Sequence, residues 1–344
     1  MQLPQLRSRF WLAMPLLTLF IALTAHPQQP LPPQAMAGAA TETAKADPQL
    51  APPLPKIPEN RLVLNDLTIF RYNPIGLETQ VRFGWQHKLY DADNTPIRRD
   101  NFLFAGTFLR LNPASLRAAG MVEVQPFTLI NLRFTAEYIH YYGNYTFIQS
   151  RPSATSDLSD KSMKAEAKGP LGNYAGGGFH ATFEPLFQVK AGPIALRNRA
   201  LFGWFDMNLQ RGDRVWYEAT LDTAIPAKGL VFANDLDLLY QLKLGTTSTL
   251  NLGTRYSVVE PLYSSEQILP TESLTNVNNG HQRLGLIAAY TLYDDGYTSF
   301  NKPTIVLISS WYLQHRYRTG ADTSQALPYI VLGFAFQSDF LGGQ

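Results

Sequence analysis

The chain has 344 residues, with 29 basic and 27 acidic side chains and no cysteine. This near balance of charge gives no basic surface of the kind that binds nucleic acid, so we expect no nucleic-acid partner. The lack of cysteine excludes disulfides, thiolate metal sites and cysteine nucleophiles. Charged residues make up only 16% of the chain and hydrophobic residues 45%, whereas a soluble domain is typically about one quarter charged.

The N-terminus has the pattern of a secretory signal peptide. Arg7 and Arg9 precede an apolar run from Phe10 to Ala25 that is short and interrupted by proline, and small residues follow it. We predict a signal peptide over residues 1–25, with cleavage after Ala25 or as late as residue 39. The alternative is an uncleaved anchor helix.

Residues 26–61 have the composition of a linker, because proline and alanine recur there and no hydrophobic periodicity is present. A proline-rich docking ligand is the alternative to a spacer. From about residue 62 the pattern changes to alternation of apolar and polar residues, which continues to residue 344. We therefore assign residues 62–344 to a single β domain and expect the linker to lie in the periplasm.

Alternation with a period of two predicts strands with one apolar and one polar face. In the segment 79–89, Val81, Phe83 and Trp85 share one face, while Arg82 and Gly84 lie on the other. The twelve predicted strands lie near 79–89, 100–111, 119–128, 130–142, 179–190, 194–208, 213–223, 230–243, 250–258, 283–292, 303–318 and 329–340. The segment 66–72 is a thirteenth strand or an entry strand, so we expect about twelve strands within a range of 10–14.

The last predicted strand carries the strongest pattern. One face holds Ile330, Leu332, Phe334, Phe336 and Phe340, and the other holds Tyr329, Val331, Gly333, Ala335, Gln337 and Asp339. It resembles the C-terminal signature strand of bacterial outer-membrane β-barrels, which alternates hydrophobic residues and closes on an aromatic residue. One departure is that Leu341 to Gln344 follow the final aromatic.

This resemblance implies an all-β, antiparallel, up-and-down transmembrane β-barrel in the bacterial outer membrane. It also implies contact with outer-membrane lipid and insertion by the barrel-assembly machinery. Each predicted strand is about ten residues or longer, which is the length that a tilted strand needs to cross a bilayer. A soluble two-sheet sandwich is the alternative, but its solvent face would carry more bulky charged residues.

Two long predicted loops, at 150–176 and 261–280, conflict with the predicted strands. Long loops of such barrels share the extracellular side, yet five predicted strands separate these two. Either one predicted strand between 177 and 260 is wrong, or one long loop is periplasmic.

The predicted inward face carries the candidate functional residues. Arg197 and Arg199 are the best candidates for contact with an anion, Asp235 and Asp237 are their acidic counterparts, and Trp216 is predicted to lie inside. These charges either pair within a partly filled lumen or line a narrow pore with a slight preference for anions. The complete set of lumen candidates is Arg82, Arg133, Glu137, Glu184, Arg197, Arg199, Arg214, Trp216, Glu218, Asp235, Asp237, Arg255 and Arg283.

Signals for an enzyme are poor. The stretch from Asn278 to Arg283 departs from the His-x-Ser-Asn-Gly pattern of outer-membrane phospholipases, because Arg283 stands where the nucleophilic serine would be. His180 near Glu184 suits a hydrogen-bonded lumen histidine better than acid–base chemistry. We expect no catalytic residues, no metal site and no cofactor. The favoured function is a porin or channel for small polar solutes; a plugged structural or interaction barrel that uses its extracellular loops is the alternative, and a lipid-modifying enzyme is less favoured.

Overall fold

The computed structural model describes residues 57–92 and 95–341, and the predicted signal peptide and most of the linker lie outside this part of the chain. Twelve antiparallel strands form a closed barrel in which β1 pairs with β15. Closure leaves no strand edge with unpaired backbone groups, which a sheet in lipid requires. The barrel strands are β1 (Asn60–Tyr72), β2 (Gly76–His87), β3 (Phe102–Asn112), β4 (Ser115–Phe127), β5 (Ile130–Tyr142), β7 (Ala175–Ala191), β8 (Ile194–Met207), β11 (Lys228–Lys243), β12 (Thr249–Leu262), β13 (His281–Thr291), β14 (Asn301–Gln314) and β15 (Tyr329–Asp339).

Helices are few and short in the described part of the chain. They are α1 (Pro96–Arg99), α2 (Asp160–Glu166) and the 3-10 turns at Gln210–Gly212, Ser265–Gln267 and Leu274–Asn276. None of these helices is long and apolar enough to cross a membrane.

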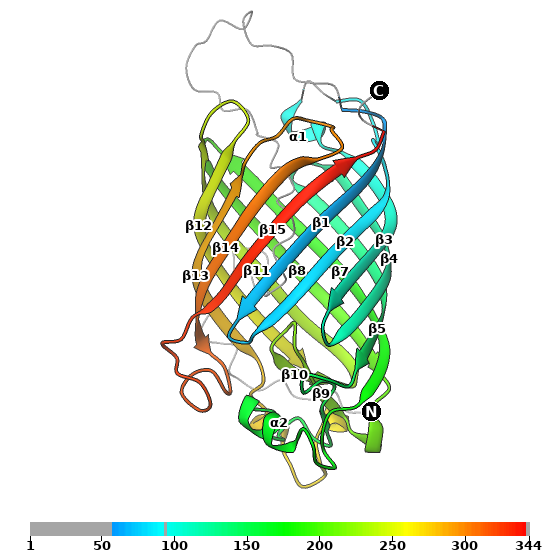
Figure 1. Ribbon diagram of the computed structural model, residues 1–344, viewed down its shortest axis with the longest axis vertical. Coiled ribbons are helices and arrows are strands. Elements are labelled where there is room, and N and C mark those ends of the chain that lie inside the picture. Colours follow the sequence, from blue (N-terminus) through cyan, green and yellow to red (C-terminus); the bar gives the residue numbers. More distant parts are fainter. Residues whose placement is uncertain (1–56, 93–94, 342–344) are drawn as a thin grey trace, which may run out of the picture.

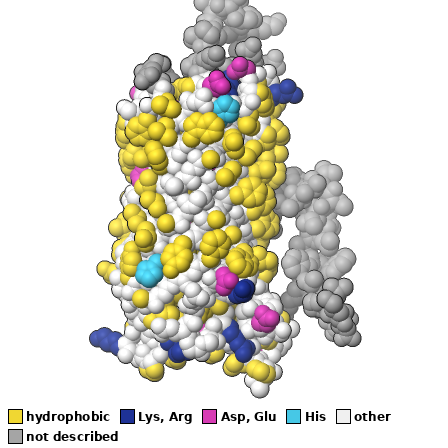
Figure 2. All heavy atoms as spheres, turned by 90° about the vertical axis from the view of Figure 1, so that its right-hand side faces the viewer, with side chains coloured by type: hydrophobic (Ala, Val, Ile, Leu, Met, Phe, Trp, Pro, Cys, Tyr) yellow, Lys and Arg dark blue, Asp and Glu magenta, His cyan; other side chains and the backbone are white. Residues whose placement is uncertain are grey.

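The strand faces agree with the predicted alternation. On β15, Leu332 and Phe334 point outward and are 52% and 41% exposed, whereas Val331 and Ala335 point inward and are buried. The flank of the barrel in Figure 2 carries many hydrophobic side chains, and the charged ones lie mostly toward its two ends. An apolar flank between polar ends is the surface that a barrel presents to a bilayer.

The prediction of about twelve strands is confirmed, although one strand was assigned wrongly and one was left undecided. The segment predicted as a strand at 213–223 is not part of the barrel wall; it forms the short β9 (Val215–Glu218) and the turn that follows. The undecided segment 66–72 belongs to β1. The two differences cancel in the strand count.

Removing the strand at 213–223 resolves the conflict between the two long loops. Four barrel strands, β7, β8, β11 and β12, separate them, so both lie at the same end of the barrel. We call this the loop end; it carries the connections 143–174, 208–227, 263–280 and 315–328 and lies at the bottom of Figure 1. The opposite end, which carries α1, is the turn end.

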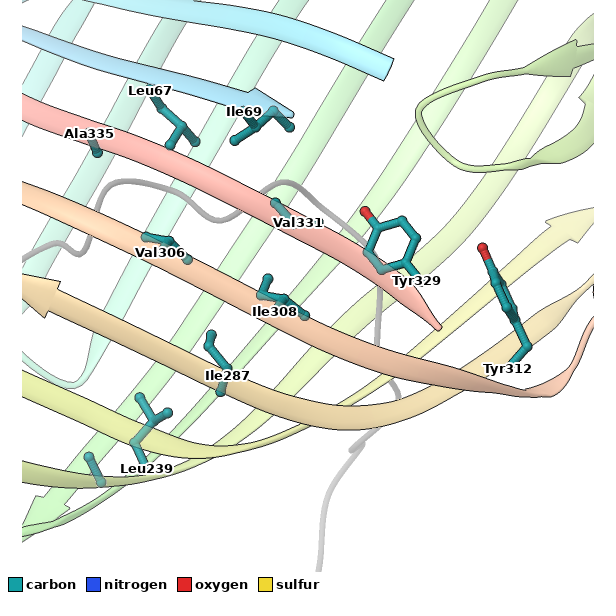
Figure 3. Packing of buried hydrophobic residues seen from close by; sticks show 11 residues of the cluster. Leu67, Ile69, Leu239, Ile287, Val306, Ile308, Tyr312, Tyr329, Val331 and Ala335 are labelled. Carbon is teal, nitrogen blue, oxygen red and sulfur yellow. The ribbon is translucent and has the colours of Figure 1, made fainter. Parts of the chain in front are cut away.

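The interior of the barrel has two different walls. One is apolar: side chains from β1, β15, β14, β13, β11 and β8 form a buried cluster that includes Leu67, Ile69, Val306, Ile308 and Val331 (Figure 3). The other wall shares β8 and β11 with the first and is otherwise built mainly from β2, β4, β5, β7 and β12; it carries buried arginine, glutamate and aspartate side chains. The candidate site lies along this charged wall.

Candidate lumen site and its lid

A hairpin from the loop end folds into the mouth of the barrel. We call residues 208–227 the lid hairpin; it contains β9 and β10 (Thr223–Pro226), which pair with each other and, through β9, with β6 (Ser150–Arg151). Figure 1 shows β9 and β10 at the loop end, above α2. Trp216 of the hairpin is fully buried, with its ring centroid 5.6 Å from that of Tyr141 and 6.0 Å from that of Phe205 on the barrel wall. The root of the hairpin therefore has an apolar seat.

The tip of the lid hairpin, residues 219–222, is held by polar groups of the barrel wall. Arg71 of β1 donates to the backbone oxygens of Ala219 and Thr220, each at 3.2 Å. His281 Nε2 at the start of β13 donates to the backbone oxygen of Leu221 at 2.8 Å. His281, which the sequence placed near a lipase-like pattern, thus positions the lid hairpin.

Two carboxylates complete this attachment, and Glu218 is the first. It accepts a hydrogen bond from the buried Arg117 of β4 and from the backbone nitrogen of Leu221, the latter at 2.5 Å. Burial alone would raise the pKa of Glu218, but Arg117 holds this pKa below its ordinary value. The carboxylate therefore stays ionised while the hairpin is docked.

Asp222 is the second carboxylate and has the most partners. Arg318 of the connection 315–328 donates to its two carboxylate oxygens at 2.7 and 2.8 Å. The hydroxyls of Tyr312 and Tyr217 also donate to it, the first at 2.5 Å. Burial would raise the pKa of Asp222, but Arg318 and then His315 hold it well below its ordinary value. The tip of the lid hairpin is thus attached through a buried charge network.

Farther into the barrel than the lid hairpin, Asp235 and Asp237 on β11 pair with arginines of the neighbouring strands. Asp237 accepts from Arg197 of β8 at 2.5 and 2.9 Å and from Arg255 of β12 at 2.6 and 2.8 Å. Asp235 lies 3.1 Å from Arg255 and accepts from the hydroxyl of Ser257 at 2.6 Å. Arg197, predicted as an anion contact, is therefore neutralised by Asp237.

A second network occupies β2, β4, β5 and β7. Glu123 accepts from Arg82 and Arg133, the latter at 3.1 Å, and from Asn131 at 2.8 Å. Arg133 also lies 3.6 Å from Glu184. The predicted candidates Arg82, Arg133 and Glu184 are thus brought together around Glu123.

A third network joins the lumen to the lid hairpin. Glu137 of β5 accepts from Arg110 at 2.6 and 3.0 Å and lies 3.7 Å from Arg117, which also contacts Glu218. His180 Nδ1 lies 3.1 Å from Glu137 Oε1. Since a carboxylate only accepts, Nδ1 carries the proton and donates. His180 is therefore a hydrogen-bonded lumen histidine whose partner is Glu137 and not Glu184.

Three predicted arginines lie outside these networks. Arg283 stacks on Tyr329, with its guanidinium carbon 3.7 Å from the ring centroid. Arg214 donates to the backbone oxygen of Ile268 and ties the lid hairpin to a neighbouring loop. Arg199 is 8% exposed and forms neither an ion pair nor a hydrogen bond with any described residue. The sequence presents Arg197 and Arg199 as equivalents, and the structure separates them.

A small cavity lies between the charged wall and the tip of the lid hairpin. About 50 Å³ of it is open to the centres of water molecules, which corresponds to roughly three to five waters. The ionisable side chains on its surface, apart from histidine, are Arg110, Arg117, Arg133, Arg199, Glu137, Glu184 and Glu218. Three of these arginines pair with glutamates, Arg110 with Glu137, Arg117 with Glu218 and Arg133 with Glu123, and Arg199 is the fourth.

Several important residues were absent from the predicted set. Arg117 and Glu123 lie an even number of positions apart on β4, so the alternation of the strand predicts that both side chains point inward. Arg71 on β1 and Arg110 on β3 lie in segments whose alternation is less regular. Arg318 lies in a loop, where no periodic pattern exists to indicate which way a side chain points.

Comparisons with known proteins give distant similarities in structure alone. No family model matches the sequence, and no curated protein matches it significantly. The translocator domain of autotransporter NalP from Neisseria meningitidis aligns with a TM-score of 0.37 and 10% identity over 82% of this chain and 88% of that one. OccAB1 of Acinetobacter baumannii aligns with a TM-score of 0.36 and 10% identity over 80% of this chain, which spans only 65% of that protein. The toluene transporter TodX of Pseudomonas putida aligns with a TM-score of 0.29 and 9% identity over 82% of this chain and 88% of that one.

The assignment of this chain rests on its own architecture. It has a closed antiparallel sheet of twelve strands, an apolar flank, a charged interior wall, and long connections gathered at one end. Membrane-spanning β-barrels combine these features, because every backbone group is paired within the sheet and the outward side chains face lipid. The chain is therefore a membrane-spanning β-barrel with a charge-lined lumen and a hairpin lid.

Proposed function

We propose that the protein is a channel for small polar solutes, with a slight preference for anions, whose loop end is closed by the lid hairpin. Solutes would pass along the charged wall once the tip of the hairpin leaves its contacts with Arg71, Arg117 and Arg318. The proposal places the selective region between the lid hairpin and the Asp235–Asp237 network.

The observation that carries this proposal is the charged wall itself. Removing charges from water is costly, and well-packed apolar residues often replace a buried ion pair without loss of stability. A barrel that needed only a filled interior would be served by an apolar lining like that on the opposite wall. Ionisable residues within a membrane protein are therefore a functional signal by default, and those of a lumen filter solutes.

A plugged structural or interaction barrel is the second candidate, and the seat of the lid hairpin favours it. Trp216, Leu221 and Ile225 pack with Ile139 and Val231 of the wall in one buried apolar cluster. Such packing stabilises a closed state, and the long loops would then be the functional surface. The two candidates differ in whether the barrel ever conducts.

Lipid hydrolysis is not part of the proposal. His281 uses one ring nitrogen to hold the lid hairpin, and Arg283 beside it stacks on a tyrosine. We further propose that the chain is inserted by the barrel-assembly machinery and that its partners are outer-membrane lipid and the transported solutes. No cofactor is needed for passive passage.

Planar-bilayer recording of the refolded protein tests the proposal. We expect rare openings for the wild-type protein and a large, stable conductance when residues 211–225 are replaced by a short glycine–serine turn. Absence of current from both proteins, each shown to be folded by heat-modifiable migration, would refute the channel and favour the plugged barrel. For the anion preference, Arg199→Glu should shift the reversal potential in a KCl gradient toward cation selectivity.

A further inference from the structure

Arg199 occupies an unusual position in the lumen. Its neighbours across the sheet are Leu186 on β7 and Asp235 on β11, but the Asp235 carboxylate is engaged by Arg255 and Ser257. The nearby Glu184 lies 3.6 Å from Arg133 and accepts from Thr182 at 3.4 Å. Arg199 is thus a buried guanidinium for which the described residues supply neither an ion pair nor a hydrogen bond.

Two further polar groups on the surface of the same cavity lack a partner. His180 Nε2 and Thr135 Oγ1 are both buried, and neither forms a hydrogen bond with a described residue. Buried polar atoms nearly always have a partner. Three groups on one cavity that no described residue satisfies form a set of hydrogen-bonding sites for a polar molecule bound within it.

The charge and the chemistry of the cavity specify the kind of molecule. Arg110, Arg117 and Arg133 each pair with a glutamate, whereas Arg199 has no ion pair among the described residues, so a bound anion would supply its counter-charge. The planar guanidinium suits the paired oxygens of a carboxylate or phosphate. In a neutral His180 ring whose Nδ1 donates to Glu137, Nε2 is an acceptor and pairs with an O–H or N–H donor.

We propose that this cavity binds one small oxyanion that also carries a hydroxyl, with Arg199 contacting the charged oxygens and His180 Nε2 accepting from the hydroxyl. Hydrogen phosphate and short hydroxycarboxylates have this chemistry. The space that the centre of a water molecule can reach in the cavity is about 50 Å³, which favours a small ion over a bulkier ligand. Thr220 and Leu221 of the lid hairpin close the cavity on the loop side. The inference rests on the proposed function, because the anion would reach the site through the lumen.

Isothermal titration of the refolded protein in detergent with inorganic phosphate tests this site without any need for conductance. We expect saturable binding with a stoichiometry of one, and at least tenfold weaker binding by Arg199→Met, because a charge-assisted hydrogen bond is lost. Sulfate, which carries no hydroxyl at neutral pH, should bind more weakly than phosphate. Arg197→Gln is the matched control, since that arginine is neutralised by Asp237, and it should bind phosphate like the wild type.

The variants also separate a local from a general effect. Arg199→Met removes a buried charge that has no partner, so we expect it to fold, as heat-modifiable migration would verify. Thr135→Val, which keeps the side-chain volume and all charges, should weaken phosphate binding without changing that migration. Equal binding by wild type and Arg199→Met, or the absence of binding by both the wild type and the variant lacking residues 211–225, would overturn the site. Phosphate binding by a barrel that never conducts would support the anion site and refute the channel. Conduction without phosphate binding would support the channel and refute the anion site.

Discussion

The attachment of the lid hairpin through Asp222 leads to our most specific prediction. Asp222→Asn removes the negative charge and keeps the shape of the side chain. The backbone of Asp222 has a φ of 55°, a conformation that asparagine adopts about as readily as aspartate. The substitution therefore tests the charge alone, without backbone strain at the tip of the hairpin.

The magnitude follows from the partners that remain. Breaking a buried ion pair on one side costs about 3–5 kcal/mol. Arg318 keeps Asp160, at 3.1 Å, as a second partner, and the amide oxygen of the new asparagine still accepts one hydrogen bond. We therefore expect docking of the hairpin to weaken by about 2–3 kcal/mol, which is roughly a 30- to 150-fold change in the ratio of undocked to docked hairpin.

Single-channel recording measures this ratio as open probability. Asp222→Asn should open about 30 to 150 times more often than the wild type, while its migration on a semi-denaturing gel should remain heat-modifiable. Asp295→Asn, an exposed position in a connection at the turn end, is the matched control and should behave like the wild type. If folded Asp222→Asn and Asp295→Asn gave the same open probability, the hairpin would not be the gate.

Three further predictions concern pH, the seat of the hairpin and the lipid-facing surface. Docking of the lid hairpin lowers the pKa of both Glu218 and Asp222. The docked state should therefore be fully stable above the ordinary pKa range of carboxylates and should weaken as the pH falls from about 4. Channel opening that begins near pH 6 in single-channel records would instead indicate that histidines control docking. Trp216→Ala should weaken the seat by about 3–5 kcal/mol and speed tryptic cleavage within 208–227, and unchanged cleavage would contradict the packing. Phe334→Lys, near the middle of β15, should destabilise the barrel by about 2–4 kcal/mol in vesicles, whereas Phe340→Lys, directly after β15, should cost about 0–1 kcal/mol. Equal costs in denaturant titrations would refute the membrane placement.

The barrel was predictable because its pattern is local. A strand between lipid and a polar lumen must alternate along its whole length, so β15 shows its two faces without any knowledge of its neighbours. The faces of the lid hairpin could not be predicted from alternation in the same way. Val215, Trp216, Tyr217 and Glu218 are all at most 3% exposed, since the hairpin is covered by the wall on one side and by loops on the other. The order of apolar and polar residues on β9 therefore does not distinguish a lipid-facing side from a lumen-facing side.

The lumen shows a second limit of prediction from sequence. Parity places Arg197 and Arg199 on one face, but their pairing depends on the register with β11 and on the rotamers of its carboxylates. The register sets Asp237 opposite Arg197 and Asp235 opposite Arg199. Arg255, from the next strand, then engages both aspartates, so that Arg197 shares Asp237 with Arg255 and Arg199 forms no ion pair with any described residue. Whether an arginine is neutralised or unpaired thus depends on contacts across three neighbouring strands, β8, β11 and β12.

The lid hairpin combines two kinds of contact, and this division limits how it opens. Its root is held by Trp216 and Ile225 in an apolar cluster to which the tip contributes Leu221, and no change of charge disturbs this cluster. Its tip is held by Arg71, Arg117 and Arg318 through charged or polar contacts, and these depend on two carboxylates. We therefore expect the tip to leave the lumen while the root stays seated. Asp222→Asn should then give a smaller conductance step than removal of residues 211–225, and equal steps would mean that the hairpin moves as one piece.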